Sequence, residues 1–264
     1  MGSATREALA GTRAALAGIG RAELRAADDL LAAARVVGAT PQLRTALTDA
    51  EADVAQKRAL VEQVFGSRIA PEAVTLLVSA ASQRWSSAGD FLAGLEDLGI
   101  RLASIAAGDG VALDAQLFDF ERTVAGDAEL ELALGSKLGA ADAKTQLVER
   151  LLAPNAAEAT IVIVRHLVQQ PRGRRIGQML REAAAIVADQ RGFDVATITT
   201  AVPLTSDQLA RLERSLAATA GRSIRFDTIV DPAVLGGVRI QLGDDVIDGS
   251  VATRLSDLRL QLAG

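Results

Sequence analysis

The chain has one histidine and no cysteine, which limits the chemistry that its side chains can do. His166 lies in the apolar run 161–168, and no second histidine or cysteine could complete a catalytic pair or a metal site with it. Asp244, Asp245 and Asp248 are a candidate cation site by residue type, but their spacing lacks the ligand pattern of an EF-hand and no glutamate closes it. A hairpin turn explains the aspartates better. We therefore expect no catalytic, cofactor-binding or metal-binding residues.

Two further features could bind a partner, and both have a plainer interpretation. The run Pro171-Arg172-Gly173-Arg174-Arg175 is basic enough to attract phosphate or an acidic partner. Because the formal net charge of the chain is −5, we favour a solvated turn between helices. Trp85 is the only tryptophan. Tryptophan is enriched at binding hot spots, yet a packing role is the favoured interpretation.

Several classes of protein are disfavoured by what the sequence lacks. It has no P-loop, no Gly-x-Ser-x-Gly elbow and no His-Glu-x-x-His motif, so a hydrolase or transferase is not expected. The acidic balance argues against a nucleic-acid partner. No apolar run reaches the roughly 18 residues that span a bilayer, and no signal peptide opens the chain. We expect any membrane association to run through a partner.

Helical periodicity dominates the first 191 residues. Aromatic residues make up only 3% of the chain, which favours close-packed helices over a β-sandwich. Apolar spacing predicts helices over residues 3–19, 22–37, from Pro41, 49–65, from Pro71, 87–107 and 111–124.

The helical region contains an internal repeat. Six residues, Leu43, Leu47, Lys57, Leu60, Val61 and Glu62, recur 87 positions later as Leu130, Leu134, Lys144, Leu147, Val148 and Glu149. Six matches at one offset indicate two copies of one helical unit, over roughly 40–106 and 127–191. We expect an N-terminal helical bundle over residues 1–107 and a second helical unit over 108–191.

After Gly192 the pattern changes from helical to alternating. It predicts a strand, a helix, two further strands, a short strand and a last helix over about 251–262. Residues 192–264 therefore form a small α+β module. The expected fold class is α+β: a mostly helical bundle with a duplicated unit, followed by this module.

The end of the chain resembles a known family. The residues that carry the resemblance are Pro232, Leu235-Gly236-Gly237, Gly243-Asp244, Val246-Ile247-Asp248-Gly249-Ser250-Val251 and Arg254-Leu255. Together they closely resemble the C-terminal signature of the F-type ATP synthase delta subunit, whose mitochondrial relative is the oligomycin-sensitivity-conferring protein. Weaker similarity extends through the helical units, and the second copy resembles the longer actinobacterial form of the family.

The resemblance implies a function without a chemical step. It implies a non-catalytic stator subunit of the peripheral stalk, one copy per proton-translocating ATP synthase complex. Its partners would be the N-terminal segments of the alpha subunits and the C-terminal segment of a b-type stalk subunit. It would need no cofactor and would lie on the cytoplasmic side of the plasma membrane, attached through the complex. The alternative that the residues leave open is a generic helical-repeat scaffold with an appended α+β interaction module.

Two sets of residues are candidates for these contacts. For the alpha subunits we expect a groove between the first helix and the long helix, formed by Arg6, Leu9, Arg13, Leu16, Phe91, Leu95, Leu98 and Leu102. An apolar stripe also usually faces its own bundle, so these leucines have a core role as their alternative. For binding or supporting the b-type stalk we expect Pro232, Gly236, Gly237, Asp248, Gly249 and Ser250. The glycine pair indicates unusual backbone angles or a close backbone approach.

Overall fold

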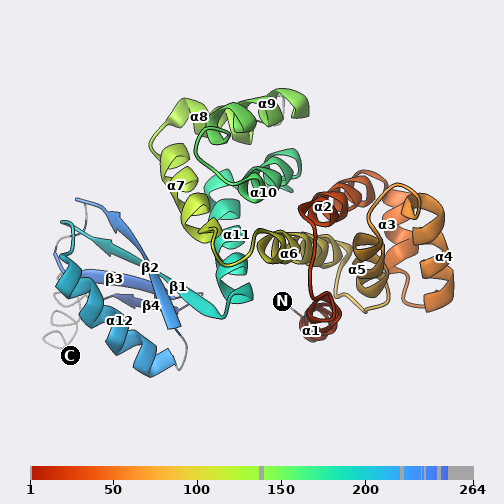
Figure 1. Ribbon diagram of the computed structural model, residues 1–264, viewed down its shortest axis with the longest axis horizontal. Coiled ribbons are helices and arrows are strands. Elements are labelled where there is room, and N and C mark those ends of the chain that lie inside the picture. Colours follow the sequence, from red (N-terminus) through yellow and green to blue (C-terminus); the bar gives the residue numbers. More distant parts are fainter. Residues whose placement is uncertain are drawn as a thin grey trace, which may run out of the picture. The chain divides into compact units, whose positions relative to one another are not determined.

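The computed structural model describes residues 2–136, 140–220, 223–232, 234, 236–242 and 245–248. Contacts divide the chain into two compact units, Met1–Val187 and Ala188–Gly264. The described part of the first unit is helical, and the described part of the second contains a four-stranded sheet with the helix that connects two of its strands (Figure 1). The α+β fold class is confirmed. The expected division at residue 107 stays a prediction, since both helical regions lie within the first unit.

Most of the expected helices begin within about two residues of the predicted positions. The helices of this region are α1 (Ser3–Ala17), α2 (Leu24–Ala39), α3 (Pro41–Thr48), α4 (Val54–Phe65), α5 (Pro71–Ala81), α6 (Ala88–Ala107), α7 (Leu113–Ala125), α8 (Ala128–Gly135), α9 (Ala141–Leu152), α10 (Glu158–Gln169) and α11 (Ile176–Gln190). The prediction of a helix from residue 49 was wrong, because Asp53 and Gln56 form a capping box that starts α4 at Val54.

The offset of the sequence repeat recurs in the element boundaries. Helices α8, α9 and α10 begin 87 residues after α3, α4 and α5, and α11 begins 88 residues after α6. Helix α7 likewise follows α2 by 89 residues. We call α2–α6 the first copy and α7–α11 the second copy.

Helix α6 is the centre of the first copy and also contacts the second. It packs against α1, α2, α3 and α5, and across the repeat against α10. Gly99 permits a close approach of α2, because a Cβ added there would lie 2.3 Å from Leu31 Cδ2. The ring of Trp85 packs against Gly94, where an added Cβ would also clash with it. The Nε1–H of Trp85 donates a hydrogen bond to the carbonyl oxygen of Ala80 at 2.8 Å. The structure thus gives Trp85 the packing role that the sequence favoured.

The second unit is built on a mixed sheet with strand order β2-β1-β3-β4. The strands are β1 (Phe193–Thr200), β2 (Ser223–Val230), β3 (Val238–Leu242) and β4 (Asp245–Asp248). Strands β1 and β2 are parallel and are joined through α12 (Ser206–Ala220), whereas β3 pairs antiparallel with β1 and with β4. A crossover helix is the connection that a parallel pair requires.

One face of this sheet forms a small core. Ala196, Ile198, Ile224 and Ile240 are buried there, with leucines of α12 packed against them. The predicted order of strand, helix and three further strands is confirmed. The predicted last helix, over about 251–262, lies outside the described residues.

None of the helices that the structure describes is both long and apolar enough to cross a membrane.

Candidate partner-binding surfaces

Helix α1 divides the first set of candidate residues into two groups. Its buried stripe is Thr5, Ala8, Thr12 and Leu16, and Thr5 fixes the helix by donating its hydroxyl to Asp90 of α6 at 3.0 Å. The remaining members of the set on this helix, Arg6, Leu9 and Arg13, are exposed or half-buried. Arg13 also forms an ion pair with Asp97 of α6, with 3.4 Å between Nη2 and Oδ1. A partner can therefore reach α1 along one side only.

The α6 members of this set lie in the core. Phe91, Leu95, Leu98 and Leu102 each have 0% of their surface exposed, because α6 is surrounded by other helices. Leu16 of α1 is 2% exposed. In this arrangement the five apolar side chains support a surface from beneath, and they cannot touch a partner unless the helices separate.

The second candidate set lies around the connection between β2 and β3. Gly236 and Gly237 have φ angles of +75° and +87°, which confirms the unusual backbone angles expected from the glycine pair. Pro232 is exposed at the start of this connection, and Asp248 pairs with Arg239 in the register of β4 against β3. The other two candidates, Gly249 and Ser250, lie outside the described residues.

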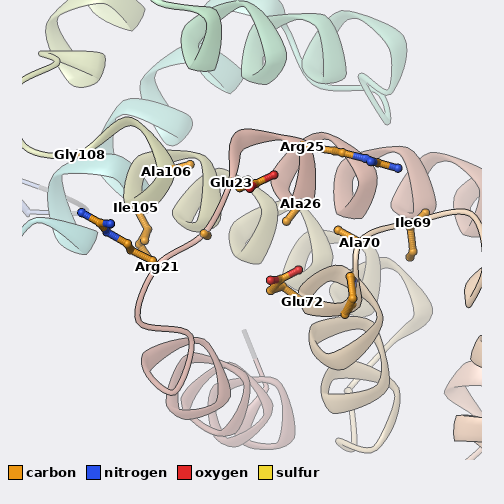
Figure 2. A pocket seen from close by; sticks show the side chains of 12 residues that line it. Arg21, Glu23, Arg25, Ala26, Ile69, Ala70, Glu72, Ile105, Ala106 and Gly108 are labelled. Atoms are coloured by element: carbon orange, nitrogen blue, oxygen red, sulfur yellow. The ribbon is translucent and has the colours of Figure 1, made fainter.

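An open pocket of about 810 Å³ lies where the ends of several helices of the first copy meet. Figure 2 shows Arg21 beside Ile105 on one side of it and Glu72 with Ala70 on the other. Its lining thus combines an apolar part with opposite charges, contributed by the α1–α2 connection and by the ends of α2, α5 and α6. Such a surface suits a peptide segment that has both apolar and charged side chains.

A buried ion cluster joins α6 to the second copy. Glu96 has a side chain only 6% exposed, and its carboxylate accepts hydrogen bonds from Arg172 at 2.7 Å and from Arg174 at 2.9 Å. Arg174 also pairs with Glu182 of α11 at 2.9 Å. The Nε2 atom of His166 lies 3.3 Å from the same carboxylate. We call these groups the Glu96 cluster.

Burial and two neighbouring polar groups set the protonation state and tautomer of His166. An arginine can only donate, so the 3.2 Å contact between Arg35 Nη1 and His166 Nδ1 makes Nδ1 the acceptor and leaves the proton on Nε2, which donates to Glu96. Burial lowers the pKa of His166 and outweighs the opposing effect of Glu96, so the ring is neutral at pH 7. Burial by itself raises the pKa of Glu96, but hydrogen bonds from His166 and Arg174 and the charge of Arg172 hold it at about 2.

The arginine run was therefore interpreted wrongly from the sequence. Arg172 and Arg174 are about one-fifth exposed and are bonded to Glu96 instead of forming a solvated turn. Neither Glu96 nor Arg35 was predicted from the sequence as a functional residue. A glutamate next to Leu95 in an apolar helical stripe was the available signal, because a buried charge requires a partner.

Comparison with known proteins gives these surfaces a context. The sequence model of the family described as "ATP synthase delta (OSCP) subunit" matches residues 102–262, which include the whole second copy and most of the α+β module. A chain from the cryo-EM structure of the Toxoplasma gondii mitochondrial ATP synthase hexamer covers 58% of this chain and 87% of its own length, at 21% identity. Its TM-score of 0.39 is too low to support an argument.

The curated relatives extend the match to the residues before 102. The ATP synthase subunit delta of Leifsonia xyli is 54% identical over 265 residues, covering 100% of both chains. The ATP synthase subunit delta of Acidothermus cellulolyticus is 40% identical over 226 residues, covering 84% of this chain and 82% of its own. The chain belongs to the ATP synthase delta (OSCP) subunit family.

Proposed function

We propose that this chain is the peripheral-stalk adaptor of an F-type ATP synthase, linking the alpha subunits of the catalytic head to a b-type stalk subunit. The observation that carries the proposal is the full-length, 54% identical relative that is an ATP synthase subunit delta. In this role the chain acts through two binding surfaces and has no active site of its own. One copy per complex is attached to the cytoplasmic side of the plasma membrane through its partners.

The alpha-subunit contact is proposed on the helical unit, at α1 and α6. Leu9 supplies a half-buried apolar side chain between the exposed Arg6 and Arg13. An amphipathic segment with acidic residues beside its apolar face would complement that pattern. The buried α6 side chains of the proposed set would hold the surface in shape beneath the partner.

The contact with the b-type stalk is proposed on the α+β module. Gly236 and Gly237 set the path of the β2–β3 connection, and this path determines where Pro232 and β3 present their surfaces. The residues following β4, with Gly249 and Ser250, complete the proposed set. These positions are the ones that carry the family signature in the sequence.

The test is calorimetric titration of the purified full-length chain with two peptides. One spans the N-terminus of the alpha subunit from the same organism, and the other the C-terminus of its b-type subunit. We expect saturable binding of both. The charge-reversing variant Arg13→Glu should weaken binding of the alpha peptide only.

The matched control for this variant is Arg58→Glu. Arg58 is also an exposed arginine, at 59%, but it lies on α4 away from the proposed surface. Equal loss for both variants would reject α1 as the contact. Failure of the parent chain to bind either peptide would reject the adaptor and favour a generic scaffold.

A further inference from the structure

The Glu96 cluster lies where the two copies of the helical unit meet. Glu96 comes from α6 of the first copy, and His166 from α10 of the second. Arg172 and Arg174 come from the turn between α10 and α11. One buried carboxylate therefore holds groups from both copies.

Contacts from α2 extend the same junction. Arg35 of α2 donates a hydrogen bond to His166 at 3.2 Å. Asp28, on the same helix, accepts a hydrogen bond from Arg165 at 2.7 Å. Arg165 also lies 3.6 Å from Glu149 of α9. Polar contacts thus join α2 and α6 of the first copy to α10 and the α10–α11 turn of the second.

The corresponding helix of the first copy lacks these groups. With the offset of 87 that relates α5 to α10, the positions of Arg165 and His166 are taken by Val78 and Ser79. At these two positions the first occurrence of the unit therefore carries no charged or ionisable side chain. The charged groups are an addition at the junction and are not required by the packing of the repeat itself.

Two residues of the turn between α10 and α11 have left-handed backbone angles. Arg172 has a φ of +49° and Gly173 a φ of +81°. A left-handed conformation is unfavourable for arginine, and such strain persists only where the surroundings enforce it. Here it brings Arg172 and Arg174 to the same carboxylate from one short turn.

Buried ion pairs contribute little net stability compared with apolar packing, but they accept few alternative geometries. We infer that Glu96 is a positioning residue, which locks the two helical copies in one relative orientation and makes them a single rigid link. Such a link suits an adaptor under sideways load. The inference concerns the isolated chain, so it can fail or hold independently of the partner contacts proposed above.

The absence of cysteine makes the test direct. Spin labels on Gln63→Cys in α4 and Arg150→Cys in α9 occupy equivalent exposed positions of the two copies, 87 residues apart. Pulsed electron resonance then gives the distribution of distances between the copies. We expect a single narrow distribution for the doubly labelled parent chain.

Glu96→Gln in this background should broaden the distribution while circular dichroism retains the helical signal. The matched control is Glu121→Gln, which neutralises another buried carboxylate, whose partner Arg181 also lies within the second copy. The control should keep the narrow distribution. An unchanged distribution for Glu96→Gln, or equal broadening in the control, would overturn the inference.

If Glu96→Gln does not fold, a second variant tests whether the Glu96 cluster fixes the orientation of the two copies. Arg172→Gly removes one bond to the carboxylate and also relieves the backbone strain, so it should fold. We expect it to broaden the distribution as well. A narrow distribution in Arg172→Gly would then count against the lock.

Discussion

Glu96 and His166 are separated by 70 residues in sequence, yet the carboxylate of one lies 3.3 Å from Nε2 of the other inside the helical unit. Both side chains are nearly inaccessible, with 6% and 2% of their surface exposed. The contact joins the two copies of an internal repeat in a subunit that belongs to the ATP synthase delta (OSCP) family.

Removal of the carboxylate should cost more than an ordinary core substitution. Glu96→Ala removes the buried carboxylate that Arg172 and Arg174 share, and breaking a buried ion pair in this way typically costs about 3–5 kcal/mol. We expect a loss of that order in the free energy of unfolding, measured by urea denaturation. The control Glu62→Ala removes an exposed i,i+4 pair with Arg58 and should change it by less than about 1 kcal/mol. Similar small losses for both would contradict the burial argument.

The stability of the helical unit should fall as the pH drops below about 6.5. That is the ordinary pKa of a histidine in an unfolded chain, and burial lowers the pKa of His166 in the folded chain. Over this range the unfolded state binds a proton that the folded state does not, so stability rises with pH and is lost on acidification. His166→Gln, a neutral replacement, should flatten the slope of the unfolding free energy between pH 7 and 5. An unaltered slope would mean that another group causes it.

The close contact between α2 and α6 depends on a glycine. Gly99→Ala would put a methyl group 2.3 Å from Cδ2 of Leu31, which is itself fully buried. Overpacking of a core typically costs about 1–3 kcal/mol. The control Gly135→Ala meets no atom within 4 Å and should be neutral or slightly stabilising. Thermal unfolding of the two variants side by side would show whether the contact is as tight as the structure has it.

The glycine pair before β3 gives a prediction for the α+β module. Gly236→Val places a β-branched residue at a φ of +75°, which such residues scarcely adopt. We expect weaker binding of the b-type peptide, while helical circular dichroism and binding of the alpha peptide are unchanged. Gly20→Val, in an open position of the helical unit, is the control. Unchanged affinity for the b-type peptide in Gly236→Val would show that this connection does not shape the binding surface.

Local signals in the sequence were sufficient to predict most of the elements. Helix starts at Pro41 and Pro71 and the strand alternation after Gly192 were confirmed, because backbone restriction by proline and the period of apolar residues act over a few neighbours. The start of α4 was missed because two side chains of a capping box competed with the apolar pattern. The left-handed glycines before β3 were expected because only glycine adopts that conformation readily.

Local sequence patterns did not predict which of the candidate site residues lie in the core and which are accessible to a partner. An apolar stripe indicates that one face of a helix is covered. It does not show whether a partner or the neighbouring helices of the same chain cover that face of α6. Only the tertiary structure decided that Phe91, Leu95, Leu98 and Leu102 are core, since α6 is surrounded within its own unit. The same holds for the arginine run, whose partner Glu96 lies 76 residues away from Arg172.

The sequence by itself determined the family, the repeat and the order of elements, because these depend on residue identity and on spacing along the chain. The tertiary structure alone decided which charges are buried together and which helices join the copies. Those contacts depend on how distant segments pack, and a hydrogen bond between residues 70 positions apart leaves no periodic trace in the sequence. The junction of the two copies therefore became visible only when Glu96, His166 and Arg172 were seen in one place.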